Sequence, residues 1–117
     1  GESGVKTIYG TLEKYKKIYN NSLPNLGDII MFDRTTSETK KLTHAGIVVN
    51  VDKEDETITY IHASTSKGLV LGYMNLKYPD LARKNGKVIN SYLRAGGGVD
   101  SLASKCFNSY GTILDLP

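Results

Sequence analysis

Five short apolar stretches, separated by polar segments, are the feature that most limits how this 117-residue chain can fold. Each stretch has the length of a single strand, and most of the connections are short enough to reverse the chain directly. Consecutive strands joined by short turns pair antiparallel. The sequence therefore predicts a mainly antiparallel five-stranded sheet, with strands at residues 28–32, 44–51, 56–63, 69–74 and 87–95.

Short helices are expected to flank this sheet. Apolar and aromatic residues over 9–19 recur at the spacing of one helix face. A second helix is predicted within 78–86, after Pro79, and a third near 101–107. Because a helix precedes the sheet, the predicted fold class is α+β.

The length of the chain indicates one domain, which we place at residues 1–95, followed by a C-terminal tail at 96–117. The net charge of +3 is mild, and no nucleic-acid-binding motif accompanies it. No apolar run approaches the length of a membrane span, and no signal peptide is recognisable. A single cysteine, Cys106, excludes an internal disulfide and a zinc knuckle.

The second and third predicted strands form a hairpin that holds the only two histidines in the chain. If Val51 pairs with Thr57, then His62 lies opposite Gly46, and His44 points to the same face two residues away. The two rings are then diagonal neighbours, roughly 7–8 Å apart by backbone. A register shift of one residue would place them on opposite faces. Gly46, which has no side chain, is expected to leave room beside them.

Two adjacent imidazoles suit acid–base chemistry. His44 can act as a general base near neutral pH, and His62 can hold its far ring nitrogen and fix its tautomer. Metal binding would need a third ligand, for which Asp33 or a loop Glu is on offer, and no metal or other cofactor is predicted. The remaining alternative is that both are ordinary strand-end histidines bonded to the backbone.

A wider pattern comes from four segments in a fixed order: LGDIIMF (26–32), THAGIVV (43–49), YIHASTSKGLVLGYM (60–74) and SYLRA (91–95). This series resembles the NlpC/P60 superfamily of cell-wall cysteine peptidases over about residues 23–95. The resemblance implies a papain-like α+β fold and a Cys-His-His catalytic set that hydrolyses peptide bonds of peptidoglycan stem peptides. Carried over by position, His44 is the base and His62 orients it.

Further expectations come with the resemblance. Asp28 would be structural, holding the loop that enters the first strand, and Thr43 stands where the family often has Ser. The implied partner is a peptidoglycan peptide. The implied location is periplasmic, in the cell envelope or secreted.

The family's nucleophile is a cysteine in an Asp-Cys-Ser-Gly motif at the start of an upstream helix, and no cysteine precedes His44 here. In one account the chain is a fragment that begins after the nucleophile helix, which would leave an apolar sheet face exposed for self-association. In a second it is a domain without the nucleophile, a wall-binding or interaction module, in which Gly-Glu-Ser-Gly puts Glu2 in the cysteine's place. In a third the order is permuted, as in lecithin:retinol acyltransferase-like proteins, and Cys106 is the nucleophile of an acyltransferase-like or thioesterase-like enzyme. Without an activated thiol, the chain as it stands is predicted to be inactive as a hydrolase.

Overall fold

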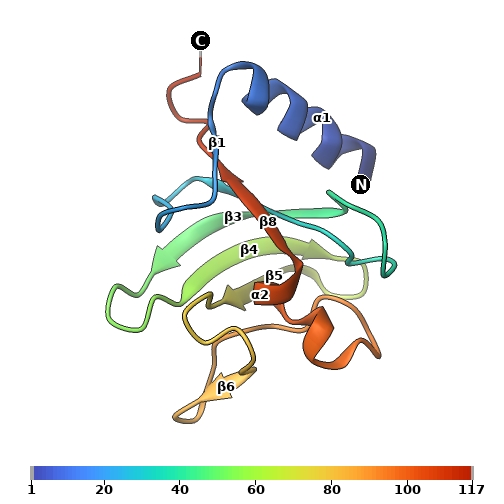
Figure 1. Ribbon diagram of the computed structural model, residues 1–117, viewed down its shortest axis with the longest axis vertical. Helices are drawn as coiled ribbons and strands as arrows, with labels where there is room; N and C mark the ends of the chain where they lie inside the picture. Colours follow the sequence, from blue (N-terminus) through green and yellow to red (C-terminus); the bar gives the residue numbers. More distant parts are fainter. Residues whose placement is uncertain (1, 117) are drawn as a thin grey trace.

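The structure is a computed structural model that describes residues 2–116, with the side chains of Glu2 and Ser3 left undescribed. Its fold is α+β, built around a six-stranded antiparallel sheet in the order β1-β8-β2-β3-β4-β5 (Figure 1). The strands of this sheet are β1 (Ile18–Tyr19), β2 (Ile29–Phe32), β3 (His44–Val51), β4 (Ile58–Ser64), β5 (Gly68–Met74) and β8 (Phe107–Gly111). The remaining elements are α1 (Glu2–Lys14), β6 (Arg83–Lys84), β7 (Lys87–Val88), the 3₁₀ helix η1 (Gly98–Ser101) and α2 (Ala103–Cys106).

The first four predicted strands are confirmed as β2 to β5, whereas the fifth is wrong. Of residues 87–95, only Lys87–Val88 form a strand, and they pair with β6 outside the main sheet. The buried Asn90 explains the difference. Its amide nitrogen donates to three backbone carbonyls and its Oδ1 accepts from the N–H groups of Asn75 and Ser104. Side-chain hydrogen bonds therefore satisfy this segment in place of a strand ladder.

The sixth strand of the sheet is β8, which the sequence does not predict. It pairs with both β1 and β2, so the segment 96–117, set apart above as a tail, supplies a strand in the interior of the sheet. A short helix near 101–107 is present as α2.

The predicted helix over 9–19 is wrong in its boundaries, since α1 ends at Lys14. Lys16 takes a positive φ of 58°, which stops the helix, and Ile18–Tyr19 form β1. The side chain of Tyr19 contacts the ring of Tyr110 and donates a hydrogen bond to Asp28. These contacts hold residues 18–19 in the sheet instead of in the helix.

The predicted helix within 78–86 is also wrong. Asn85 and Gly86 both have positive φ, at 52° and 78°, and they make the tight turn of the β6–β7 hairpin. An Asn-Gly pair is the strongest short-range signal for such a turn.

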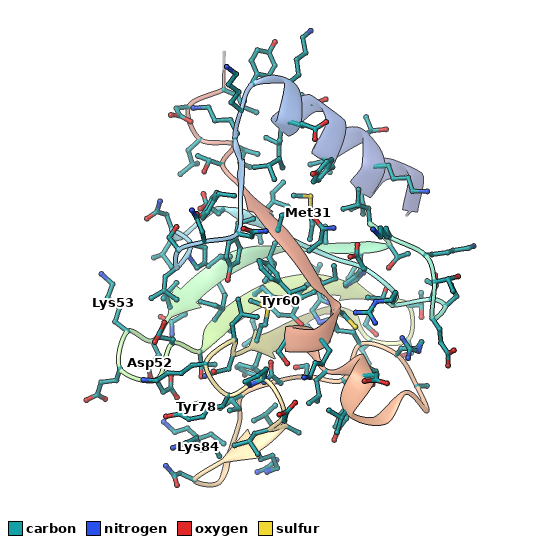
Figure 2. The ribbon with its side chains drawn as sticks, viewed as in Figure 1. Met31, Asp52, Lys53, Tyr60, Tyr78 and Lys84 are labelled. Carbon is teal, nitrogen blue, oxygen red and sulfur yellow. The ribbon has the colours of Figure 1, made fainter. Side chains whose placement is uncertain are left out.

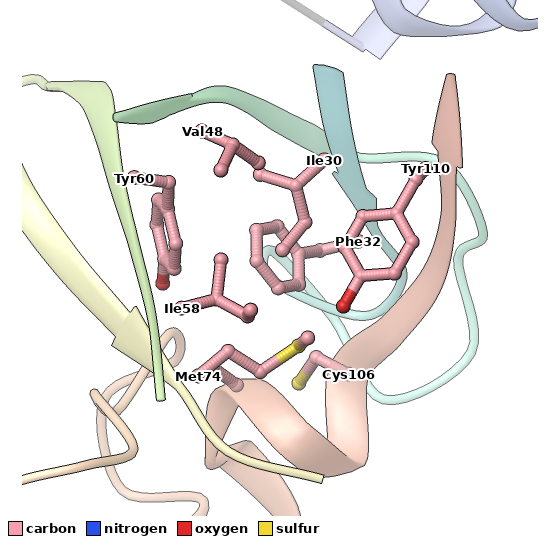
Figure 3. Packing of buried hydrophobic residues seen from close by; sticks show 9 residues of the cluster. Ile30, Phe32, Val48, Ile58, Tyr60, Met74, Cys106 and Tyr110 are labelled. Carbon is pink, nitrogen blue, oxygen red and sulfur yellow. The ribbon is translucent and has the colours of Figure 1, made fainter. Parts of the chain in front are cut away.

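The sheet has a hydrophobic cluster on each face. Alternation along β2 sends Ile30 and Phe32 into the larger cluster, together with Tyr60, and Met31 into the smaller cluster beneath α1 (Figure 2). Figure 3 shows Phe32 between Tyr60 and Tyr110 in the larger cluster, with Cys106 beside Met74.

We predict opposite effects for alanine at two glycines. At Gly72, a Cβ would overlap the buried ring of Tyr60, so Gly72→Ala should destabilise the fold by about 1–3 kcal/mol. At Gly10, in α1, a Cβ meets nothing within 4 Å, so Gly10→Ala should stabilise it by about 0.5–1 kcal/mol. Urea unfolding of both variants tests this, and equal effects would contradict the packing described.

Candidate functional site

The pairing of β3 with β4 changes register halfway along the hairpin. Near the turn Val51 pairs with Ile58, so the predicted pairing of Val51 with Thr57 is wrong by one residue. A β-bulge between Val48 and Asn50 then absorbs an extra residue of β3. This bulge decides which side chains of the two strands share a face.

Beyond the bulge Ile47 pairs with Ile61, and this register carried one residue further sets Gly46 opposite His62, as the sequence predicts. Without the bulge, the register near the turn would set His62 opposite Ile47, whose side chain points away from that of His44. The extra residue in β3 is therefore what brings the two histidines to one face of the sheet.

The two imidazoles meet directly. Nε2 of His44 lies 2.8 Å from Nδ1 of His62, and the rings are nearly perpendicular, with centroids 4.9 Å apart. The ring of Phe32 stacks against His44, and that of Tyr60 lies 5.1 Å from His62. These aromatic rings come from the core, so the pair is supported from below by well-packed side chains.

The sequence suggests that Gly46 leaves open space beside the histidines, but the structure shows that it does not. A Cβ at this position would lie 2.8 Å from the carbonyl oxygen of Ile61, 3.0 Å from the ring of Tyr60 and 3.4 Å from Cβ of His62. The glycine instead lets β4 and the Tyr60 ring approach closely, and this close packing fixes the position of His62.

Both histidines are neutral at pH 7. Burial, followed by the charge of His62, lowers the pKa of His44 to about 4, and burial lowers the pKa of His62 as well. In the neutral pair one ring donates its N–H and the other accepts it. Among the described residues, none hydrogen-bonds to Nδ1 of His44, which leaves that nitrogen available to a ligand or nucleophile.

Thr43 holds the loop that leads into the site. Its N–H donates to the carbonyl of Phe32, and its hydroxyl bonds to both the N–H and the hydroxyl of Thr35. Asp33, the proposed third metal ligand, accepts hydrogen bonds from the N–H of Leu42 and the side chain of Asn108. Within residues 2–116 no cluster of three or more His, Cys, Asp or Glu side chains is placed to hold a metal.

An open groove runs over the histidine pair. One part, about 330 Å³, is lined by His44, His62 and the residues Thr35, Thr36, Thr43, Ala63, Ser64, Thr65, Tyr92 and Leu93. A larger part, about 790 Å³, continues from His62 toward β5 and shares Ser64, Thr65, Tyr92 and Leu93. Tyr60, Tyr73 and Tyr78, which the sequence favours as packing residues over groove residues, line neither part.

Two of these tyrosines pack elsewhere in the structure. Tyr60 is fully buried in the core, and Tyr78 lies under the ammonium groups of Lys77 and Lys84 (Figure 2). The missed groove residue Tyr92 is 60% exposed and follows the Asn90 network. Its only signal in the sequence was its position within the Arg-bearing segment SYLRA at 91–95.

Cys106 lies away from the groove lining. Its side chain is fully buried in the larger cluster, where its thiol approaches the carbonyl oxygen of Asp100, and burial raises its pKa. A raised pKa and complete burial are the opposite of what a reactive thiol needs.

Asp28 is structural, as expected. It is fully buried, and its Oδ2 accepts hydrogen bonds from the N–H of Asn25 and the hydroxyl of Tyr19. Its backbone also continues the pairing with Val48, so the loop before β2 is tied to β3.

Helix α1 packs on the face of the sheet opposite to the one that carries the two imidazoles. It contacts β3, and Figure 1 shows it on the outer side of the sheet. Val5, near the start of α1, belongs to the same cluster as Ala45, the neighbour of His44. Glu2 is the first residue of α1, and only its backbone is described. The amino end of a helix that packs on the sheet is therefore close to the start of β3.

The depressed pKa of His44 predicts a specific pH dependence of stability. In the unfolded chain the imidazole binds a proton below about pH 6.5, whereas in the folded protein it does so only near pH 4. The free energy of unfolding should therefore fall as the pH drops from 6.5 to 4. Urea titrations should show a shallower pH dependence for His44→Gln than for the wild type. An equal slope in both proteins would contradict a neutral, half-buried His44.

Among the residues that the structure describes, no helix is long and apolar enough to span a membrane. The chain matches no protein-family model, no curated protein and no solved structure at a significant level.

Proposed function

We propose that this chain carries the site of a cell-wall cysteine hydrolase of the NlpC/P60 type, acting on peptide bonds of peptidoglycan stem peptides. In the chain as it stands the site binds such peptides without hydrolysing them, because no thiol accompanies the base. The observation that carries the proposal is the 2.8 Å contact between Nε2 of His44 and Nδ1 of His62 beside an open groove.

In the proposed site the two rings have different roles. When Nε2–H of His44 donates to Nδ1 of His62, the free lone pair of His44 is on Nδ1, where no described residue occupies it. His44 is then the base, and His62 fixes its tautomer and ring orientation, as the aspartate does in a serine-protease triad. His62 is therefore a positioning residue.

The low pKa of His44 fits a site that lacks its thiol. A base works best when its pKa is close to the working pH, and a pKa of about 4 is too low for this. A thiolate beside the imidazole would raise this pKa, because an opposite charge favours the protonated form. The base and the nucleophile would thus activate each other.

The account that puts Glu2 in the cysteine's place can be tested in this chain, because Glu2 begins α1 and α1 contacts β3, the strand that starts at His44. A helix amino terminus stabilises a thiolate through its dipole and free N–H groups. The first residues of α1 resemble the family's nucleophile motif with Glu2 in place of cysteine, and α1 contacts β3. Because α1 covers the face opposite to the His44 ring, a thiol at residue 2 has to reach His44 around the start of β3. Of the three accounts of the missing nucleophile, the burial of Cys106 argues against the permuted one.

The experiment is to supply the thiol. We expect Glu2→Cys to hydrolyse a purified muropeptide at neutral pH, with products identified by mass spectrometry. Adding His44→Ala to this variant should lower the rate by at least about 10³-fold, because the thiolate loses its base. His62→Ala should reduce the rate and shift its pH profile, since it changes how His44 is held.

A matched control is Ser3→Cys, which places the thiol one residue further along α1 and about 100° around the helix. This variant should be labelled by iodoacetamide but should not hydrolyse the muropeptide. If a folded Glu2→Cys protein is inactive, or if Ser3→Cys is equally active, the proposed site is wrong.

We also expect the wild-type protein to bind the same muropeptide in calorimetry while leaving it intact over a prolonged incubation. Cleavage by the wild type would show that the nucleophile is another group. An absence of both binding and cleavage would contradict the choice of substrate.

A further inference from the structure

Strand β5 is the outer strand of the sheet, and part of its edge is unpaired. The N–H and C=O groups of Tyr73 both bond to Ser91 on the side away from β4. In an antiparallel ladder, the residues whose backbone groups point outward alternate with those that point to the neighbouring strand. The backbone groups of Leu69 and Leu71 therefore also point away from β4.

Only the first half of this edge is free. At Tyr73 the outward N–H group donates a hydrogen bond to the hydroxyl of Ser91. The next outward N–H group, that of Asn75, donates to Oδ1 of Asn90. No described residue hydrogen-bonds to the outward N–H and C=O groups of Leu69 and Leu71. Two residues of β5 thus present four backbone groups in the alignment that an added strand requires.

The free edge borders the larger part of the groove. Val70 and Leu71 line it on the β5 side, and residues 91–95 line it on the other. Its volume of about 790 Å³ is in the range of sites that bind small ligands and short peptides.

The charges along the groove have one sign. Lys67 and Arg94 are the charged side chains that line it, and no Asp or Glu lines either part. One guanidinium nitrogen of Arg94 donates a hydrogen bond to the carbonyl oxygen of Arg34. Lys67 forms no ion pair with a described residue. Such a groove favours a ligand that carries carboxylates.

The opposite face of the edge is apolar. The side chains of Leu69 and Leu71 are 72% and 54% exposed, and they point away from the face that carries Val70 and His62. A strand added to β5 would place every second side chain beside these leucines and the others toward the groove.

We propose that β5 binds an extended acidic segment of a partner protein as an added strand, paired with the backbone of Leu69 and Leu71. The segment alternates apolar residues, which pack beside the leucines, with acidic residues, which face Lys67 and Arg94. Regular strand pairing needs L-residues, so a stem peptide that contains D-residues is not this ligand. The interaction requires neither His44 nor hydrolysis and stands apart from the function proposed above.

The test uses a fluorescent L-hexapeptide that alternates valine with aspartate, measured by anisotropy. We expect saturable binding that weakens with salt and that is lost for the D-enantiomer. Methylation of the backbone nitrogens on alternate residues should abolish binding for one of the two alternations and spare the other, because only one edge of the peptide faces β5. This control needs no change in the protein.

Two variants at one position separate pairing from side-chain contact. Leu71→Pro removes an outward N–H without taking a donor from the β4–β5 ladder, and it should weaken binding by tenfold or more. Leu71→Ala keeps the N–H and should weaken it less. Lys67→Glu should weaken binding of the acidic peptide at low salt.

Equal binding of the D-enantiomer, or of both methylated peptides, would overturn strand addition. Dimerisation that Leu71→Pro abolishes would instead assign the edge to a second copy of the chain. Activity of Glu2→Cys carrying Leu71→Pro would show that the hydrolase site survives without strand binding, so the two proposals can fail separately.

Discussion

The β-bulge in β3 is the constraint on which the rest of this site depends. It changes the pairing with β4 from the register set at the turn to one in which His44 and His62 share a face. Gly46 then lets β4 and Tyr60 pack closely enough to hold His62, and Phe32 and Tyr60 support the two rings from the core. Because of the extra residue in β3, two ring nitrogens from neighbouring strands come to lie 2.8 Å apart.

In the function proposed above, His44 is the base and its nucleophile is not present in the chain. His44 is oriented, neutral and free at Nδ1, and the start of α1 lies close to its strand. The only thiol of the chain is instead sealed in the core, where burial raises its pKa. The arrangement explains why the pKa of His44 is so low, since burial disfavours its charged form and no described carboxylate or thiolate offsets that cost.

Much of this structure follows from local patterns in the sequence. The strands β2 to β5 are predictable because each is a short apolar run between turn residues, and the β3–β4 hairpin is predictable because its connection is short. The bulge is invisible in the sequence, and the predicted faces are correct only because the register assumed at the turn matches the one found beyond it. Whether the two histidines lie on the same face of the sheet therefore could not be decided without the structure.

The errors have a common cause in contacts between distant segments. Tyr19 leaves the helical pattern because it pairs with Tyr110, about 90 residues away, in a strand whose polar sequence gives little signal. Residues 89–95 have the composition of a strand, but the buried side chain of Asn90 satisfies five hydrogen bonds with the surrounding backbone and draws the segment out of the sheet. The groove wall at Tyr92 and Leu93 exists because of this displacement.

The most direct test of the central claim is an NMR measurement on protein with ¹⁵N-labelled histidine at pH 7. The account predicts a scalar coupling across the hydrogen bond between Nε2 of His44 and Nδ1 of His62, with the proton on Nε2 and none on Nδ1 of His44. A proton on Nδ1 of His44, or the absence of any coupling between the two rings, would contradict the assignment of His44 as a base held by His62.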